Sequence, residues 1–281
     1  MLEAATGLLT CPVCSDPLIL AATAARCPVG HSYDVARQGY VNLLGSAPPA
    51  HADTAAMVAA RDRVLTSGAF TIIETALATQ LTAARSLLDV GGGTGHHLAR
   101  VLDAVPGARG VSLDISVRAA RRAARAHPRL ASVVADTWSG LPILSAGIDG
   151  LLCIFAPRNP AEFARVLAPG GQLLIVTPDP DHLASLRTAY SLLGVEVDKS
   201  DRLLRTLADT FTLETRMPLR SALLAEAPLV DDLIAMGPNA FHHTPTDIRA
   251  MPTEIAVTLW VFRRRSGSGV TPAAASPVSR K

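Results

Sequence analysis

Four side chains near the start of the chain have the types and spacing of a zinc site. Cys11, Cys14, Cys27 and His31 follow the pattern C-x2-C-x12-C-x3-H. A closed tetrahedral set of sulfur and nitrogen ligands typically holds a structural zinc ion. A segment this short cannot bury a core of its own, so a metal ion explains how it folds. The spacing therefore predicts one structural zinc ion per chain.

Disulfide bonds are the alternative use of these cysteines. The fourth cysteine, Cys153, lies inside an apolar run that is typical of a buried strand. The N-terminus also lacks a basic stretch followed by a long apolar segment, so no export signal is expected. Disulfides are uncommon without export. Zinc is thus favoured, and Cys153 is expected to be a small core residue.

A second group of residues, in the segment LLDVGGGTGHHLARVL, has the pattern of a nucleotide-type cofactor site. Asp89 ends an apolar run, and Gly91, Gly93 and Gly95 follow in the order D-x-G-x-G-x-G. Glycines allow a sharp turn between strand and helix and a close approach to a ligand. Asp114 and Asp136 end the next two apolar runs. The expected cofactor contacts are Asp89, Gly91, Gly93, Thr94, Gly95, His96, Asp114, Asp136 and Thr137.

The glycine spacing favours S-adenosylmethionine over a dinucleotide. In a dinucleotide fingerprint the third glycine stands one residue later, and NAD or FAD is the alternative that remains. We expect Asp114 to accept both ribose hydroxyls and Asp136 to lie near the adenine amino group, with Thr137 and Trp138 flanking the ring. The ends of consecutive parallel strands meet at the crevice where open α/β sheets bind ligands.

Strand-like and helix-like segments alternate in the order that builds a parallel sheet. Strands are expected at 86–90, 108–115, 131–136, 149–157, 172–178, 211–218 and 254–265, and helices at 55–68, 70–81, 96–105, 116–126, 161–171 and 219–236. The predicted fold class is α/β: a doubly wound, Rossmann-like sheet of the class I methyltransferase type with a small N-terminal zinc-binding module. The expected units are 1–45 (zinc module), 46–84 (linker and helices), 85–265 (methyltransferase domain) and 266–281 (a disordered tail).

Composition limits the remaining function classes. With 49% hydrophobic and 18% charged residues, the 281-residue chain can bury a large core. No apolar run reaches the roughly 18 residues that a membrane-spanning helix needs. The chain is therefore expected to be cytoplasmic and not membrane-bound. A net charge of +2 neither requires nor excludes a nucleic-acid partner.

With both groups of residues in place, the chain resembles the bacterial 23S ribosomal RNA guanine-N1 methyltransferases. The resemblance extends over residues 10–264 and is carried by the zinc pattern, HSYDVARQGYVNLL, AAMVAARDRVLTSGAF, LDVGGGTG and IFAP. It implies methylation of a guanine in the hairpin 35 loop of 23S rRNA, as a housekeeping modification or as resistance to macrolides such as tylosin. It also implies that the zinc module recognises RNA. A homodimer is left open.

Three features depart from this picture. Gly92 stands where the loop often has cysteine, and the tail after Arg265 is not covered by the resemblance. Residues 1–50 hold three acidic and two basic side chains, a net charge of −1, so the module is not visibly basic. Arg37, Arg61 and Arg63 flank the junction with the larger domain and are better candidates for RNA contacts than the helical arginine stripe at 118–125, which more often is a solvated face.

The catalytic group is not identified by any spacing rule. Methyl transfer depends mainly on aligning the nucleophile with the methyl group, and guanine N1 must lose a proton to become nucleophilic. The candidates are Phe155, near the end of one expected strand, and Asp179 and His182, which follow the next one. Phe241, His242 and His243 lie in a loop that is a candidate for closing over the base.

Two other functions remain open on the sequence alone. One is methylation of a small molecule, such as an antibiotic or quinone precursor, with a purely structural zinc module. The other is a regulatory protein that binds the cofactor without turnover. Salt-sensitive binding to ribosomal RNA would favour the RNA methyltransferase over these two alternatives.

Overall fold

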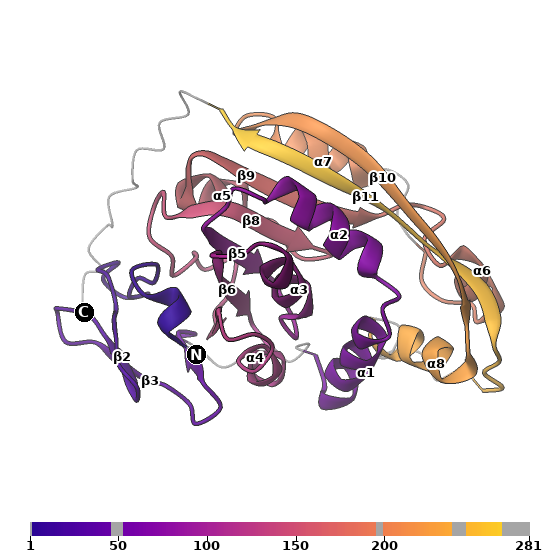
Figure 1. The fold of residues 1–281 in the computed structure, drawn as a ribbon, viewed down its shortest axis with the longest axis horizontal. Helices are drawn as coiled ribbons and strands as arrows, with labels where there is room; N and C mark the ends of the chain where they lie inside the picture. Colours follow the sequence, from indigo (N-terminus) through magenta and orange to yellow (C-terminus); the bar gives the residue numbers. More distant parts are fainter. Residues whose placement is uncertain (1, 46–52, 195–198, 238–245, 266–281) are drawn as a thin grey trace, which may run out of the picture.

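A computed structural model describes residues 2–45, 53–194, 199–237 and 246–265. Its centre is an eight-stranded sheet in the order β10-β11-β9-β8-β5-β6-β7-β4 (Figure 1). The strands are β4 (Tyr40–Asn42), β5 (Ser86–Val90), β6 (Arg109–Asp114), β7 (Leu130–Val134), β8 (Ile148–Ile154), β9 (Leu167–Pro178), β10 (Phe211–Ala225) and β11 (Met251–Arg264). The strands from β9 to β4 run parallel, whereas β11 and β10 add an antiparallel edge.

Helices cover both faces of the sheet. They are α1 (Ala55–Thr66), α2 (Thr71–Gln80), α3 (His96–Ala104), α4 (Val117–Ala123), α5 (Pro160–Val166), α6 (Ala184–Ala189), α7 (Lys199–Leu207) and α8 (Ala227–Ala235). Because successive strand residues point to opposite faces, Leu87 lies in a core cluster with α2, α3 and α8, and Leu88 in another with α5 and α7. This double coverage explains why β5 and β7 are buried along their whole length.

The zinc module is joined to the central sheet by a strand of its own. It contains a short 3-10 helix η1 (Leu2–Ala5) and a small sheet of β1 (Ile19–Leu20), β2 (Ala24–Arg26) and β3 (Ser32–Asp34). β4 then runs parallel to β7, with Val41 opposite Val133. Residues from η1 to Leu43 share one core cluster with β6 and β7. Module and catalytic domain therefore share a sheet and a core.

Two predicted helices are wrong in part. Residues 219–225, expected to begin a helix, continue strand β10, and only 227–235 are helical, as α8. The strand persists because β11 pairs with it as far as Ala225 opposite Met251. The helix expected at 161–171 ends at Val166, because Leu167 pairs with Ile148 and starts β9. The remaining predicted elements are confirmed to within a few residues at their ends.

The described helices include none long and apolar enough to cross a membrane. The candidate loop residues Phe241, His242 and His243 lie outside the described residues, as does the tail 266–281.

Candidate functional site

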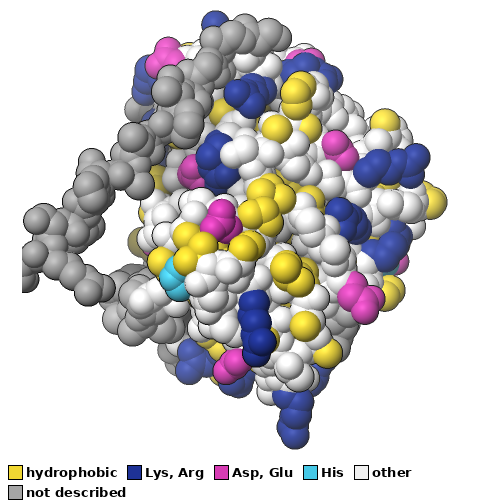
Figure 2. Space-filling view, turned by 90° about the vertical axis from the view of Figure 1, so that its left-hand side faces the viewer, with side chains coloured by type: hydrophobic (Ala, Val, Ile, Leu, Met, Phe, Trp, Pro, Cys, Tyr) yellow, Lys and Arg dark blue, Asp and Glu magenta, His cyan; other side chains and the backbone are white. Residues whose placement is uncertain are grey.

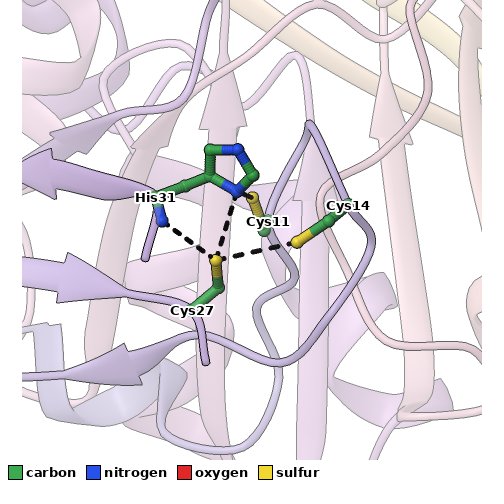
Figure 3. A group of neighbouring side chains, drawn as sticks. All are labelled: Cys11, Cys14, Cys27 and His31. Carbon is green, nitrogen blue, oxygen red and sulfur yellow. Dashed lines mark hydrogen bonds between the residues drawn. The ribbon is translucent and has the colours of Figure 1, made fainter. Parts of the chain in front are cut away.

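The four zinc-site residues come together as the spacing predicted. One ligand atom from each of Cys11, Cys14, Cys27 and His31 lies within 4.8 Å of the others. Figure 3 shows the side chains converging from the loop before β1 and from the turn between β2 and β3. Cys11 Sγ and Cys27 Sγ lie 3.6 and 3.3 Å from His31 Nδ1, and Cys14 Sγ lies 3.6 Å from Cys27 Sγ. These spacings match the edges of a zinc tetrahedron, about 3.5 Å for ligand distances of about 2.0–2.3 Å.

Further hydrogen bonds surround the thiolate positions. The Tyr33 hydroxyl lies 3.1 Å from Cys11 Sγ, and the His31 amide donates to Cys27 Sγ over 3.3 Å. Outer contacts of this kind fix ligand orientation. All four cysteines are free of disulfide bonds, and Cys153 is buried in β8 away from the cluster, as expected. The residues present therefore fit one structural zinc ion.

The face of the zinc module is not uniformly basic. Figure 2, turned toward the module side of Figure 1, shows basic side chains interspersed with acidic and apolar ones. This agrees with the net charge of −1 over residues 1–50. This face therefore has no single electropositive patch among the residues that the structure describes.

A cavity of about 810 Å³ opens at the carboxyl ends of the central parallel strands. Its walls include 91–93 after β5, Asp114 at the end of β6, 136–138 after β7 and 154–157 at the end of β8. This is the sheet edge to which the sequence assigned the cofactor. The strand ends converge there because β5, β6, β7 and β8 all run parallel.

The glycine loop has the backbone that its pattern predicted. Gly91, Gly93 and Gly95 have φ angles of 70°, 56° and 75°, a region that side chains other than glycine rarely adopt. A Cβ on Gly91 would lie 2.5 Å from the Ala156 Cβ, so the two strand ends approach as closely as they can. A Cβ on Gly95 would lie 3.0 Å from the Ala123 Cβ, which explains how α3 and α4 approach each other. Thr94, one residue earlier, is buried and does not line the cavity.

Asp114 is fixed at the cavity wall by two backbone amides. Its Oδ2 accepts from the Gly93 amide and its Oδ1 from the Ser116 amide, each over 2.8 Å. Burial raises the pKa of Asp114, and the two amide bonds oppose that shift. A carboxylate offers about four acceptor positions. Two are used by the amides, so Asp114 can still accept a pair of ribose hydroxyls.

Asp89 lies beneath the glycine loop and does not line the cavity. Both of its carboxylate oxygens are buried without a hydrogen-bond partner in the part of the chain that the structure describes. Burial and the charge of Asp114 raise its pKa to about 7. A Cβ on Gly92 would lie 2.8 Å from the Asp89 Oδ2 and 2.4 Å from the Ser112 Oγ, so a larger residue there would require these buried side chains to shift. With this pKa the carboxyl is only partly ionised at neutral pH, and a cation bound above the loop would favour its ionised form.

Asp136 and Thr137 both line the cavity, together with Trp138. The Asp136 carboxylate accepts from the Trp138 amide over 2.9 Å and from the Ser139 hydroxyl over 2.8 Å. Trp138 is 65% exposed, so its ring is available to a ligand. This placement agrees with an adenine position beside β7.

His96 lies outside the cavity, and its neighbour His97 lines it. The two imidazoles lie 3.2 and 3.3 Å from Oε1 of Glu74, a buried residue of α2. Burial would raise the pKa of Glu74, but the two histidines outweigh it and lower the pKa to about 2. His96 thus joins α3 to α2, and this contact is the role that the structure gives it.

The three catalytic candidates are placed differently. Phe155 and His182 line the cavity, with ring centroids 6.0 Å apart, and Phe70 lies 6.3 and 6.2 Å from them. Phe155 has a φ of 53°, an uncommon backbone for a bulky residue that is often found at functional sites. Asp179 does not line the cavity; its Oδ1 accepts from the Thr258 hydroxyl over 2.7 Å.

The imidazole ring of His182 accepts a hydrogen bond from the backbone. Its Nδ1 accepts from the Ala256 amide over 3.2 Å. Burial, followed by the nearby Arg187, lowers the pKa of His182 to about 4. The ring is therefore neutral at physiological pH, and with Nδ1 accepting, its proton is on Nε2.

Arg61 and Arg63, expected to meet RNA, have partners inside the protein. Arg63 donates to both carboxylate oxygens of Asp232, which joins α1 to α8. Arg61 lines the cavity, pairs with Asp53 and donates to the Met236 carbonyl over 3.0 Å. Arg63 thus stabilises a helix contact, and Arg61 belongs to the cavity wall.

The sequence did not single out several residues of the cavity wall. These are Asp53, Leu65, Phe70, Leu183, Leu186 and Arg187. They come from α1, α2, α6 and their neighbours, which the chain brings over the strand ends. No spacing rule identifies such residues, because they reach the site through helix packing.

Comparisons with known proteins agree with this architecture. The zinc-ribbon family described as RlmA, N-terminal, matches residues 9–48, and the family described as methyltransferase domain matches residues 87–171. Among solved structures, a chain from the complex between the Haloferax volcanii Trm112 methyltransferase activator and a methyltransferase is 17% identical, with a TM-score of 0.52. It covers 74% of this chain and 94% of that one. This likeness shows a shared fold.

Closer relatives extend along nearly the whole chain. The 23S rRNA (guanine(748)-N(1))-methyltransferase of Streptomyces fradiae is 46% identical over 253 residues, which are 88% of this chain and 90% of the relative. A Micromonospora griseorubida protein assigned to the 23S rRNA guanine-N1 methyltransferases is 44% identical over 266 residues, 86% of this chain and 90% of the relative. With its zinc site, its methyltransferase sheet and this degree of identity, the chain belongs to the 23S rRNA (guanine-N1)-methyltransferase family.

Proposed function

We propose that this enzyme transfers a methyl group from S-adenosylmethionine to N1 of a guanine in the hairpin 35 loop of 23S rRNA. One observation carries the proposal: the zinc module adds strand β4 to the sheet whose strand ends form the cavity, in a chain 46% identical to an enzyme named for guanine 748. A small-molecule methyltransferase would need the cavity and not the module. The proposal includes the division of the chain at residues 45, 84 and 265. In it, residues 1–45 recognise the RNA and residues 85–265 carry out methyl transfer.

The cavity suits the cofactor and a base together. S-adenosylmethionine carries its methyl on a positively charged sulfur, and the buried Asp89 below the loop favours that charge. Asp114 would accept the ribose hydroxyls, and Asp136, Thr137 and Trp138 would surround the adenine. The exposed ring of Phe155, beside His182 and packed against the buried Phe70, is a surface on which a flipped guanine would stack.

We assign His182 a donor role at the target base. Guanine N1 becomes nucleophilic when its proton is lost and negative charge moves to O6. Because Nδ1 of His182 accepts the Ala256 amide, its Nε2 carries a proton that can be donated. That N–H would bind O6 and stabilise the developing charge, as an oxyanion-hole donor does. The N1 proton is lost to solvent water.

Mapping of the methyl group tests the proposed function. Purified protein with isotopically labelled S-adenosylmethionine should label a hairpin 35 transcript, and reverse transcription should stop at one guanine. A transcript with adenine at that position is the matched control and should stay unlabelled. Cofactor binding without transfer to any RNA would instead favour a regulatory protein, and transfer to a macrolide alone would favour a small-molecule enzyme.

Replacing Asp114 with alanine should weaken S-adenosylmethionine binding about 5- to 150-fold. The estimate takes about 1–3 kcal/mol for leaving buried hydroxyls unpaired, at roughly 1.4 kcal/mol per factor of ten. Calorimetric titration with the cofactor measures the change. Asp103→Ala, on the exposed side of α3, is the control and should bind normally. Unchanged affinity of Asp114→Ala would mean that the ribose lies elsewhere.

A further inference from the structure

A second, smaller cavity adjoins the first. It has a volume of about 360 Å³ and shares Trp138, Phe155 and Pro157 with the larger one. Among the described residues that line it, Arg158, Lys199 and Arg202 are cationic and none is acidic. A cavity with cationic and aromatic walls beside a proposed base-binding site has the composition of an anion site.

The guanidinium group of Arg158 has a hydrogen-bond donor without an acceptor. Its Nε is buried and has no hydrogen-bond partner in the described part of the chain. Burial lowers the pKa of Arg158, and the nearby charge of Arg202 lowers it further. Holding a half-buried guanidinium with an unbonded donor costs free energy. Because Arg158 also lines the cavity, an anion bound there would stabilise its charge.

Two elements of the fold carry the cationic side chains of the second cavity. Arg158 lies four residues after the end of β8 and immediately after Pro157. Lys199, Arg202 and Thr206 stand at positions i, i+3 and i+7 of α7, which places them on one face of that helix. The cavity is therefore formed between a strand end and a helix face, and both are described elements of the fold.

We propose that this second cavity binds the backbone phosphate next to the target guanine while the guanine itself occupies the larger cavity beside Phe155. The inference rests on the proposed function. A flipped base has left its stack, and contacts to the adjoining phosphates hold the nucleotide in register. Arginine suits this role because its planar guanidinium binds two phosphate oxygens at once.

Substitution of Arg158 gives the first test. Arg158→Met should raise the KM for a hairpin 35 transcript about 10- to 100-fold, the effect of losing a charge-assisted hydrogen bond. Its affinity for S-adenosylmethionine should not change. The slope of log affinity against log salt should fall by about 0.7, the value for one contact to a single strand. Arg121→Met, on the exposed face of α4, is the matched control and should behave as wild type.

Neutral backbone linkages give the decisive test. A transcript with one 2′-O-methyl methylphosphonate linkage beside the target guanine lacks that phosphate charge, and a 2′-O-methyl phosphodiester is its control. Wild-type enzyme should lose about 10-fold or more in kcat/KM at one of the two flanking linkages. Arg158→Met should show no further loss there. Arg202→Gln, an exposed side chain on α7, gives the same comparison if Arg158→Met folds poorly.

The outcomes separate the two proposals. Equal sensitivity of the wild type and both variants to the neutral linkage would overturn the phosphate site, as would wild-type insensitivity at both linkages. Normal methylation of the unmodified transcript in those cases would leave the proposed function in place. A wild-type enzyme that methylates no transcript would contradict the proposed function, and the phosphate site with it.

Discussion

Replacing Cys27 with serine is expected to remove the zinc ion and to lower the thermal stability of the whole chain in one transition. Cys27 is buried, and its Sγ lies within hydrogen-bonding distance of the ligand atoms of both Cys14 and His31. Structural zinc contributes about 10–16 kcal/mol in isolated zinc-finger peptides, as much as the entire stability of a typical domain, about 5–15 kcal/mol. Few other single substitutions should have an effect this large.

The expected loss extends beyond the module because of strand β4. β4 is the edge strand of the central sheet and pairs with β7, and η1 packs beside β6 and β7 in the same core cluster. Unfolding the first 45 residues would expose the apolar side chains of β6 and β7 that η1 and β4 cover. The sequence alone suggested instead that the larger domain would stay folded without its zinc module.

Scanning calorimetry and metal analysis of two variants check this result. Wild-type protein should contain about one zinc per chain, and Cys27→Ser none. Cys153→Ala is the control: it removes a buried thiol of β8 far from the metal site and should keep its zinc. Two separate unfolding transitions in Cys27→Ser, with the upper one at the wild-type temperature, would show that the module is an independent unit.

Local signals in the sequence predicted most of the parallel half of the fold. Strand β5 has the predicted bounds, 86–90, because a short apolar run between a linker and a glycine loop has no competing reading. The zinc ligands were equally clear, because two short turns fix their spacing. Asp114 and Asp136 reach the cavity because the ends of parallel strands must meet.

Long-range pairing determines what the sequence did not predict. Residues 219–225 have helix-forming side chains, but β11 pairs with them from a position more than 25 residues later. The partners of Arg61 and Arg63 lie on α8 and in the segment before α1, which no local pattern identifies. Arg158 becomes a candidate binding residue only through the cavity that it forms with α7. Phe70 becomes one only through its contact with Phe155.

Replacing His182 with asparagine should lower kcat for RNA methylation about 100- to 1,000-fold, the cost of removing one donor to a developing oxyanion. An asparagine amide can still accept the Ala256 N–H, as Nδ1 of His182 does, but cannot reach the position of Nε2. Glutamine is longer and places an N–H close to that position. His182→Gln should therefore stay within about ten-fold of wild type, with cofactor affinity unchanged in both variants.

The two variants distinguish a donor from a general base, because neither amide can take a proton. If His182 removed the N1 proton, glutamine and asparagine would be equally inactive. The pH dependence gives a second check: the pKa of His182 is lowered to about 4, so the ring is neutral above that value and adds no limb to the profile between about pH 5 and 9. Activity should instead rise with pH as the guanine N1 proton becomes easier to remove. A limb near neutral pH in the wild type that disappears in His182→Gln would assign proton removal to the imidazole.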